Sequence, residues 1–248
     1  MRGTSPPGAA TEGEAAHWVR AMFGRVAHRY DLANHLLSLN MDRHWRAHTA
    51  RRVQNALQNP AALAIDLCCG TGDLLLALES RRGTARPVLG SDFCHPMLQA
   101  AQEKIRERRA SAAVFEADAL ALPLPDQSAD LLTIAFGFRN LANYEVGLAE
   151  MRRVLKPGGL AAILEFSQPP NRAFAAIYNF YSRKILPRIG GALSGSRDAY
   201  EYLPESVRKF PSAEELAQDM MRAGFESVRF ERLTGGIVAL HFGVAGRR

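Results

Sequence analysis

The sequence predicts an α/β fold, namely a Rossmann-like, seven-stranded, mainly parallel sheet with helices on both faces. Three observations predict it. Short apolar runs typical of strands alternate with longer amphipathic segments, which implies β-α-β crossovers. Met97, Leu98, Ala101 and Ile105 form the apolar stripe of a helix that lies on a sheet. A Thr-Gly-Gly turn at 234–236 separates two final strand-like segments, which predicts an antiparallel hairpin that closes the sheet.

The order of elements follows from these patterns. Strands are predicted at 62–67, 87–91, 113–116, 130–136, 160–166, 227–233 and 236–243, and helices at 74–79, 96–108, 144–155 and from about Ser212. Two stretches fall outside the alternation. Residues 14–58 are predicted to form a helical cap of one or two amphipathic helices, and residues 168–210 a helical lid. Residues 1–13 are expected to be disordered, so that 14–248 form a single domain.

Composition excludes several classes of protein. The 248 residues carry a net charge of +6, with 47% hydrophobic and 23% charged residues, which is ordinary for a globular chain. No apolar run approaches the ~20 residues of a membrane span, and the first residues lack the apolar core of a secretory signal. The three cysteines suggest neither a disulfide set nor a metal motif. We therefore expect a cytoplasmic protein without a bound metal.

The positive charge does not point to nucleic acid. The densest basic run, 104–109, contains Lys104 and is interleaved with Glu103 and Glu107 at helical spacing. This arrangement favours an exposed helix face with paired charges. We therefore expect no nucleic-acid partner.

The strongest local signal is Asp-Leu-Cys-Cys-Gly-Thr-Gly-Asp at 66–73, where the first strand turns into a helix. Glycines there let a ligand approach the backbone, and the helix start offers free N–H groups. The dinucleotide pattern fails because position 75 is Leu75, and no Gly-Lys-Ser/Thr follows to make a phosphate loop. A tight turn without a ligand remains the alternative for this segment taken alone.

Carboxylates at the ends of the next strands favour a ligand-binding site over a tight turn without a ligand. Asp92 ends the second strand, where it can accept both hydroxyls of a ribose, and Asp118 with Ala119 follows the third. Acidic strand ends without a pyrophosphate motif suit a cationic nucleoside, and S-adenosylmethionine fits. A helix-capping role explains any one of these acids but not the set. The predicted cofactor-binding residues are Asp66, Gly70, Thr71, Gly72, Asp73, Asp92, Asp118 and Ala119, to which the resemblance given below adds Ala135.

Longer motifs extend this pattern over most of the chain. They are Phe-Gly-Arg-Val-Ala at 23–27, Tyr-Asp-Leu-Ala-Asn at 30–34, Gly-Thr-Gly-Asp-Leu at 70–74, Phe-Gly-Phe-Arg-Asn at 136–140, Arg-Val-Leu-Lys-Pro-Gly-Gly at 153–159, Glu-Phe-Ser at 165–167, Leu-Pro-Arg-Ile-Gly at 186–190, Tyr-Glu-Tyr-Leu at 200–203 with Ser206, and Thr-Gly-Gly-Ile-Val-Ala-Leu-His at 234–241. With them the sequence resembles class I methyltransferases, and closely resembles the ubiquinone/menaquinone-biosynthesis C-methyltransferases.

The resemblance implies cofactor contacts at Thr71, Asp92, Asp118 and Ala119. The family often has serine before the Phe-Gly-x-Arg-Asn motif, whereas this chain has Ala135, which removes a side-chain contact there. Cys68 and Cys69 replace small residues of many relatives, and we interpret both as packing residues beneath the loop.

The resemblance also implies methyl transfer to a ring carbon of a reduced quinone, with demethylmenaquinol as the expected acceptor. Arg139 is our candidate for stabilising a phenolate or polarising a deprotonating water, with a structural role as the alternative. Asn140 either orients the quinol oxygen or forms a turn. Tyr30, Asp31 and Asn34 lie in one predicted helical turn. They are candidates for the other wall of the acceptor site, and a capping or packing role is the alternative.

Further aromatic residues are candidates for contact with the prenyl tail of the acceptor. Tyr200 and Tyr202, if extended, would line a prenyl channel, and the aromatics between 174 and 181 would form the lid core or contact the tail. His241 is expected to be a sheet histidine rather than a base.

Rival functions and partners stay open at this point. The acceptor could instead be the ubiquinone-pathway benzoquinol or another small aromatic compound, or the chain could be a silent quinone-binding or assembly protein. A polyprenyl naphthoquinol partner makes an anionic membrane surface the better explanation of the surplus positive charge than nucleic acid. We therefore expect peripheral membrane association, and we keep a homodimer as one candidate assembly.

Overall fold

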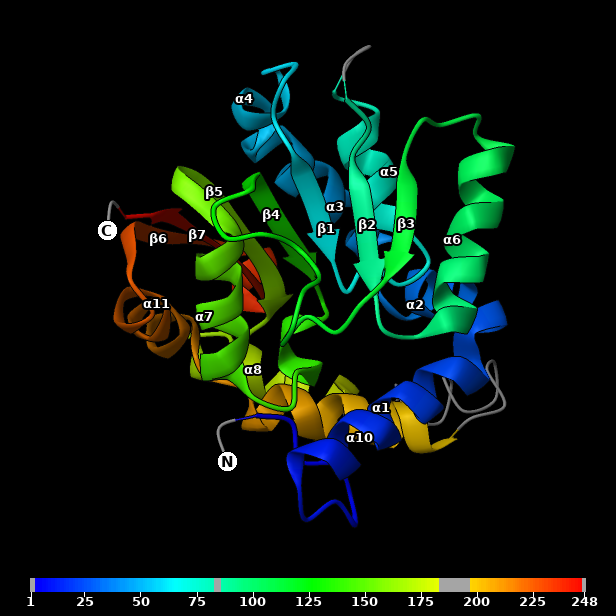
Figure 1. The fold of residues 1–248 in the computed structure, drawn as a ribbon. Coiled ribbons are helices and arrows are strands. Elements are labelled where there is room, and N and C mark those ends of the chain that lie inside the picture. Colours follow the sequence, from blue (N-terminus) through cyan, green and yellow to red (C-terminus); the bar gives the residue numbers. More distant parts are fainter. Residues whose placement is uncertain (1–2, 83–85, 183–196, 247–248) are drawn as a thin grey trace.

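The computed structural model describes residues 3–82, 86–182 and 197–246; for 29, 33, 179 and 197–201 it describes the backbone alone. Within these residues seven strands form one sheet in the order β3-β2-β1-β4-β5-β7-β6 (Figure 1). The strands are β1 Ala64–Leu67, β2 Leu89–Asp92, β3 Ala113–Glu116, β4 Ala129–Ala135, β5 Leu155–Phe166, β6 Phe225–Leu233 and β7 Val238–Ala245. β1 to β5 are parallel, and β7 runs antiparallel to both β5 and β6. The predicted fold class is confirmed.

The strand order also locates a crevice. From β1 the chain moves outward to β2 and β3 and then crosses back to place β4 on the other side of β1. Ligands of open α/β sheets bind at such a reversal, outside the carboxyl ends of the strands. In Figure 1 these ends point downward, toward α1, α2, α8 and α10.

Helices cover both faces of the sheet and its carboxyl edge. They are α1 Glu12–Val26, α2 Tyr30–Leu37, α3 Met41–Arg52, α4 Gln54–Leu57, α5 Asp73–Glu79, α6 His95–Glu107, α7 Tyr144–Val154, α8 Arg172–Phe180, α10 Arg197–Lys209 and α11 Ala213–Arg222, with short 3₁₀ turns η1 Ala27–Arg29, η2 Phe138–Asn140 and η4 Thr234–Gly236. The predicted helix starts near residues 74, 96, 144 and 212 agree within one residue.

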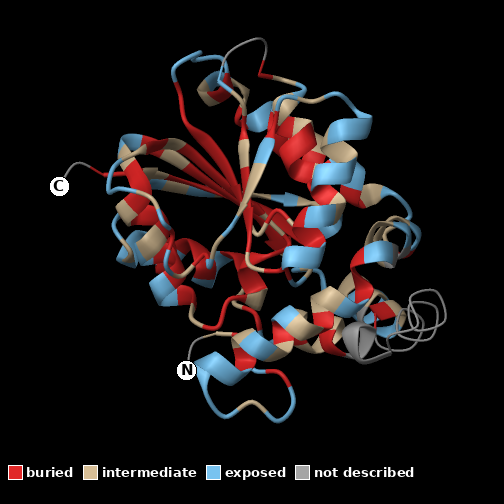
Figure 2. Ribbon diagram, turned by 45° about the vertical axis from the view of Figure 1, so that its right-hand side comes forward, coloured by how far each residue is buried: buried red, intermediate tan, exposed pale blue. Residues whose placement is uncertain are grey.

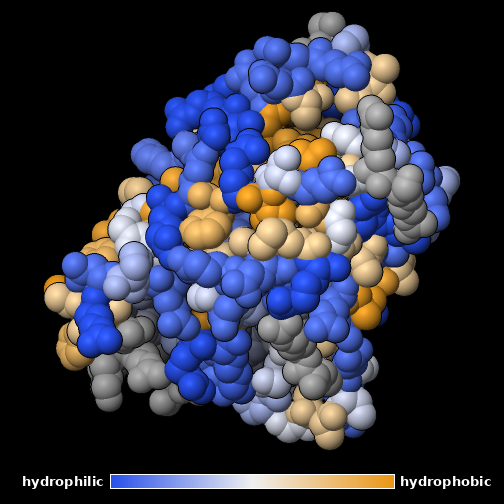
Figure 3. Space-filling model, turned by 90° about the vertical axis from the view of Figure 1, so that its left-hand side faces the viewer, coloured by the Kyte–Doolittle hydropathy of each residue, from blue (hydrophilic) through white to orange (hydrophobic). Residues whose placement is uncertain are grey.

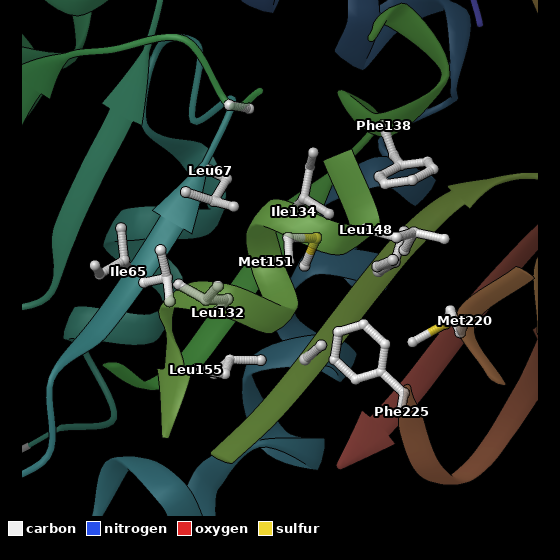
Figure 4. Packing of buried hydrophobic residues seen from close by; sticks show 14 of the residues in the cluster. Ile65, Leu67, Leu132, Ile134, Phe138, Leu148, Met151, Leu155, Met220 and Phe225 are labelled. Carbon is white, nitrogen blue, oxygen red and sulfur yellow. The ribbon is translucent and has the colours of Figure 1, made fainter. Parts of the chain in front are cut away.

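Alternation of side chains along the strands builds two cores. On β4, Leu132 and Ile134 pack with α7 and α11 residues such as Leu148 and Met220, and Figure 4 shows this cluster. Leu131, one position before Leu132, faces the second cluster, to which α3, α4 and α5 contribute. Figure 2 accordingly shows buried strands between helices whose outer surfaces are exposed. Both faces of the sheet are therefore buried, as expected for a parallel sheet.

The largest difference between predicted and observed strands is at β5. The sequence predicts a helix over 144–155 and a strand from Leu160, but α7 ends at Val154 and β5 begins at Leu155. Leu155 pairs with Ala129 across a register shift before regular pairing resumes at Leu160. The Lys-Pro-Gly-Gly segment between them resembles a loop in sequence, yet it continues the strand beyond this irregularity.

The amino-terminal cap contains more helices than predicted. Residues 14–58 form α1, η1, α2, α3 and α4 instead of one or two helices. The break between α2 and α3 falls at Leu39 and Asn40, which have φ of 52° and 60°. Trp45 of α3 packs on the sheet, whereas α1 and α2 lie beyond the carboxyl ends of the strands. The cap thus serves both as a sheet cover and as a wall beside the strand ends.

Residues 3–13 differ from the expected disordered segment. Thr4 is only 3% exposed. Its N–H donates to the carbonyl of Leu141 at 2.8 Å, and its hydroxyl lies 2.5 Å from that of Tyr202. This small polar segment packs because its partners lie far away in sequence, which composition cannot reveal.

In the described parts of the predicted lid, 168–182 and 197–210, the chain forms helices α8 and α10, and Tyr200 and Tyr202 are not extended. Both residues belong to α10, so the extended conformation on which the expectation of a common channel wall rested is wrong. α10 lies beside α1 across the carboxyl edge of the sheet (Figure 1). The Leu-Pro-Arg-Ile-Gly motif at 186–190 lies outside the described residues.

Two surface features complete the fold. β6 forms one edge of the sheet and carries Glu226, Arg229, Glu231 and Arg232, and charged edges of this kind discourage pairing with another sheet. Figure 3, which views this side, shows hydrophilic residues around a smaller apolar area. Among the described residues, no helix has the length and apolar character needed to cross a bilayer.

Close contact between two strand ends gives a test of the fold. A Cβ on Gly137 would lie 2.4 Å from Cβ of Cys68. We therefore expect Gly137→Ala to lower the free energy of unfolding by about 1–3 kcal/mol, because neither backbone can move aside cheaply. Gly13→Ala is the matched control, since a Cβ there meets nothing within 4 Å on a helix surface, and its expected effect is neutral or stabilising by up to ~1 kcal/mol. Urea unfolding of both variants measures the difference; equal effects would contradict the described contact.

Candidate active site

Two adjoining cavities lie at the carboxyl edge of the sheet. The first, which we call the strand-end cleft, is bordered by the ends of β1, β2, β3 and β4 and holds about 910 Å³ including its open mouth. The second, the helix-bounded cavity, lies between α2, α3, α8 and the residues after β4, and holds about 1000 Å³ including its mouth. Tyr30, Arg46 and Phe136 line both. Two ligands bound there would therefore be neighbours.

The loop after β1 is bent by left-handed residues. Cys68, Gly70 and Gly72 have φ of 49°, 55° and 86°. A Cβ on Gly70 would meet nothing within 4 Å, and Gly70 lines the strand-end cleft. A Cβ on Gly72 would instead lie 3.3 Å from Cβ of Ala101, so Gly72 allows the loop to pack against α6 and is not among the residues that line the cleft. Of the two predicted glycines, only Gly70 borders the space for a ligand.

Asp92 anchors this loop from the end of β2. Its carboxylate accepts hydrogen bonds from the N–H of Gly70 and of Cys94, both at 2.9 Å. Burial raises the pKa of Asp92 to about 6, although these N–H groups act in the opposite direction. Each carboxylate oxygen keeps a second lone pair, so Asp92 can still accept from a ligand hydroxyl.

Asp66 is the most deeply buried acid of the cleft lining, at 1% exposure. The hydroxyl of Thr133, its register partner on β4, donates to Oδ1 at 2.7 Å. Burial raises the pKa of Asp66 to about 7. A carboxylate in this state favours a neighbouring positive charge, because a cation restores the ionised form.

The other predicted residues of the cleft lie around its mouth. Asp118 is exposed, and its Oδ1 accepts the N–H of Leu120 at 2.9 Å. Ala119 is buried, and Ala135 ends β4. All three of the predicted residues Asp118, Ala119 and Ala135 line the cleft.

Thr71 and Asp73 form a polar network with α2 and α6. The Thr71 hydroxyl donates to Asp31 at 2.6 Å. The Nζ of Lys104 donates to Asp73 at 2.7 Å and lies 2.5 Å from the carboxylate of Asp31. Burial acts to raise the pKa of Asp73, but the charges of Arg46 and Lys104 outweigh it and lower that pKa. The expectation of Lys104 on an exposed, paired helix face is therefore wrong, because its partners come from distant segments.

Arg139 is held by a buried ion pair. Its NH1 lies 2.8 Å from Oε1 of Glu165 and also donates to the carbonyl of Phe136, and its backbone N–H donates to Oε2 of Glu165 at 3.1 Å. Phe136 has a φ of 59°, a costly conformation for an aromatic residue, which these bonds help to maintain. Arg139 lines the helix-bounded cavity, and its buried Nε has no hydrogen-bond partner among the described residues. Arg139 therefore has a structural role in the ion pair, and it also lies where its positive charge can stabilise a negative charge in the cavity.

Asn140 and Tyr30 both line the strand-end cleft. The Oδ1 of Asn140 accepts from the hydroxyl of Tyr202 at 3.0 Å, and its Nδ2 donates to the carbonyl of Phe136 at 3.3 Å. Burial raises the pKa of Tyr30, against the opposing charges of Arg139 and Arg46. Tyr30 therefore stays protonated near neutral pH and can donate a hydrogen bond.

Arg46 is a residue of the site that sequence reasoning missed. It is buried between the two cavities, pairs with Asp42, and lies over the ring of Phe136 at 5.2 Å. Carboxylates of Asp42 and Asp73 and a ring nitrogen of His35 lie within 4.8 Å of one another, and the Arg46 guanidinium supplies positive charge to this group. Glu165 was missed as well. For both Arg46 and Glu165, the signal in the sequence was a charged residue at a position of a predicted helix or strand that is otherwise expected to be buried.

Two further predictions concern residues away from ligand chemistry. His241 lines neither cavity, and its Nε2 donates to the carbonyl of Ala213 at 2.9 Å. Burial lowers the pKa of His241 to about 4, which keeps it neutral within the sheet. Cys68 and Cys69 do line the cleft, but burial raises the pKa of both thiols and leaves them weak nucleophiles.

Comparison with known proteins defines the family. Residues 10–245 match the model of the ubiE/COQ5 methyltransferase family. This chain belongs to the ubiE/COQ5 methyltransferase family. Family membership confirms the predicted resemblance and shows that the chain is an enzyme, a methyltransferase, rather than a silent binding protein. The family and its fold imply S-adenosylmethionine as the methyl donor.

Individual members of the ubiE/COQ5 family are similar over nearly the whole chain. A demethylmenaquinone methyltransferase of Thermus thermophilus is 50% identical over 90% of this chain and 99% of its own length. The demethylmenaquinone methyltransferase of Deinococcus radiodurans is 45% identical over 91% of each chain. A ubiquinone/menaquinone biosynthesis C-methyltransferase of a Geobacter species is 41% identical over 93% of this chain and 97% of its own length.

Solved structures support the same fold. A SAM-dependent methyltransferase of Thermotoga maritima superposes with a TM-score of 0.61 at 18% identity, covering 92% of this chain and 99% of its own. One from Aquifex aeolicus has a TM-score of 0.56 at 20% identity, covering 80% of this chain and 98% of its own. At these identities the similarity concerns the fold alone.

The raised pKa of Asp66 makes stability depend on pH. The pKa of Asp66 is about 7 in the folded protein against an ordinary value of 3.8, so between pH 4 and 7 the folded state holds the proton more tightly. The free energy of unfolding should therefore fall as pH rises through this window. Asp66→Asn cannot ionise, and we expect its stability relative to the unmodified protein to improve by ~1 kcal/mol or more between pH 4.5 and 7.5.

Urea unfolding at several pH values measures this effect. Asp126→Asn, which removes an exposed carboxylate, is the control and should keep the pH dependence of the unmodified protein. Parallel pH profiles for Asp66→Asn and the unmodified protein would contradict the assignment.

Proposed function

We propose that this enzyme transfers a methyl group from S-adenosylmethionine to a ring carbon of a demethylated polyprenyl quinol, with demethylmenaquinol as the acceptor. The observation that carries the proposal is the pair of adjoining cavities, one lined by acids and the other largely by apolar residues, with Tyr30, Arg46 and Phe136 in their common wall. The printed function of the Thermus and Deinococcus relatives supports this acceptor.

The strand-end cleft fits the donor by its chemistry. Asp92 is available to the ribose hydroxyls, Asp118 and Ala119 to the adenine, and Gly70, Thr71 and Asp66 to the charged amino-acid part. Burial raises the pKa of Asp66 and Asp92, and a cationic ligand relieves that cost. When bound, S-adenosylmethionine supplies an electrophilic methyl group on a positively charged sulfur.

Asp73, Gly72 and Ala135 take revised roles in this proposal. The charge of Asp73 is already compensated by Lys104, so Asp73 holds the loop in place rather than serving as the main partner of the donor. Gly72 lets the loop pack on α6. Ala135 contributes space and no hydrogen bond.

The helix-bounded cavity fits the quinol. Its wall includes Leu37, Leu39, Met41 and Ile237, which suit the apolar part of the acceptor. Arg139 lines the same cavity and keeps its positive charge, because the pKa of a guanidinium paired with Glu165 is raised despite burial. A permanently protonated arginine cannot accept the phenol proton itself, so we assign it stabilisation of the phenolate or polarisation of a water that takes the proton.

Tyr30 and Asn140, which lines the strand-end cleft alone, complete the alignment of donor and acceptor. Tyr30 borders both cavities and can donate a hydrogen bond to a quinol oxygen, and Asn140 is fixed by Tyr202 and Phe136. Methyl transfer demands an in-line approach, and positioning of this kind contributes roughly 7–11 kcal/mol to catalysis. The proposal thus rests mainly on orientation and on one fixed positive charge.

A benzoquinol of the ubiquinone pathway is the second candidate acceptor, because the Geobacter relative is named for both pathways. Labelled methyl transfer from S-adenosylmethionine to short-chain demethylmenaquinol and to the matching demethylated benzoquinol distinguishes the two. We expect product from the naphthoquinol at least about tenfold faster. Faster reaction of the benzoquinol reverses the choice of acceptor, and absence of product from both rejects the proposed function.

Removal of the charge at Arg139 tests its role. Arg139→Met combined with Glu165→Gln leaves no unpaired buried charge, and we expect the methyl-transfer rate at saturating donor to fall by about 10² or more. Arg139→Lys is the matched control, since it keeps a positive charge beside Glu165, and should lose much less. Donor affinity by calorimetry should stay within a few-fold in both. A double variant as active as the control would refute the charge-stabilising role.

A further inference from the structure

Exposed apolar side chains gather on one part of the molecule. Among the described residues, the large hydrophobic side chains that are exposed are Leu32, Leu36, Leu39, Val146, Ile177, Phe180 and Met221. Five of these seven belong to α2, the turn after it, and α8. We call Leu32, Leu36, Leu39, Ile177 and Phe180 the α2–α8 patch. Single exposed hydrophobics are ordinary, but a group of five on two neighbouring helices indicates an interaction surface.

The two helices of the patch are directly connected. The hydroxyl of Tyr181, just after α8, donates to the carbonyl of Leu37 at the end of α2 at 2.8 Å. Leu32 and Leu36 are four residues apart on α2, and Ile177 and Phe180 are three apart on α8, so each pair shares a helix face. The apolar faces therefore form one surface rather than two.

This surface adjoins the helix-bounded cavity. Leu39 is 81% exposed and also lines that cavity, so the cavity opens at the patch. Leu37, Tyr178 and Tyr181 line the same cavity from the same two helices. An apolar chain that extends from the cavity would leave the protein through the α2–α8 patch.

The charge around the patch is positive. Arg43 at the start of α3 and Arg172 at the start of α8 are exposed. In residues 27–53 and 171–182 the only acids are Asp31 and Asp42. Asp31 is paired with Lys104, and Asp42 with Arg46. Apolar side chains bordered by exposed cations suit a surface that carries negative charge.

We propose that the α2–α8 patch docks the enzyme on an anionic lipid bilayer, with the mouth of the helix-bounded cavity against the membrane. The inference rests on the proposed function, in which the acceptor carries a polyprenyl tail. The tail then remains in the lipid while the ring enters the cavity. Five side chains are few for a stable protein interface, which uses about 20–30 residues on each side, but they are enough for shallow insertion into a bilayer.

Vesicle flotation with a pair of matched variants tests this inference. Leu36→Gln with Ile177→Gln changes one exposed side chain on each helix of the patch, at 47% and 68% exposure. Val146→Gln with Met221→Gln, at 42% and 54% exposure on α7 and α11, is the matched control. On phosphatidylglycerol-containing vesicles we expect the patch variant to bind about tenfold more weakly than the unmodified protein, and the control to bind equally well. Binding should fall with salt and on purely zwitterionic vesicles.

A water-soluble short-chain demethylmenaquinol, assayed without vesicles, controls for folding. All three proteins should methylate it at rates within about twofold, because neither pair of substitutions lies in a cavity wall. If no protein methylates this acceptor, the proposed function fails, and the flotation result still decides the docking surface. The inference is overturned if the unmodified protein does not bind vesicles or if both double variants lose binding equally. It is also overturned if the patch substitutions reduce the molecular mass of the protein in sedimentation, because a second copy of the chain then covers the patch.

Discussion

The buried ion pair between Arg139 and Glu165 is the interaction on which the site depends. Both side chains are at most 5% exposed, and a buried charge without its partner costs several kcal/mol. The pair therefore fixes the segment after β4 to the end of β5, and with it the left-handed Phe136. Because Phe136 belongs to the wall of both cavities, the adjacency of the two cavities follows from this one contact.

The amino-terminal helices complete what the sheet begins. Polar contacts from Asp31 to Thr71 and Lys104 attach α2 to the loop after β1 and to α6, and Tyr30 of the same helix lines both cavities. The same fixed orientation turns Leu32 and Leu36 outward. One helix thereby forms part of the site on one side and part of the exposed apolar surface on the other.

Sequence patterns predicted what local periodicity and strand-end position determine. The strands, the Gly70 turn and the acids Asp66, Asp92 and Asp118 follow from such patterns, and Gly70 and these three acids line the cleft. Contacts between distant segments were not predictable in the same way. Lys104 has acidic neighbours on its own helix, yet its observed partner Asp31 is 73 residues earlier in the chain. Thr4, Arg46 and Glu165 likewise acquire their roles from tertiary neighbours, which no window of sequence contains.

The raised pKa values of Asp66 and Asp92, about 7 and about 6, couple the cleft to protons. A cation bound beside these acids favours their ionised forms, so its binding releases protons below neutral pH. By thermodynamic reciprocity, protons and a cationic cosubstrate compete for the same cleft. Acidification of its surroundings would then slow such an enzyme by loss of cosubstrate, before any change in the geometry that performs the transfer.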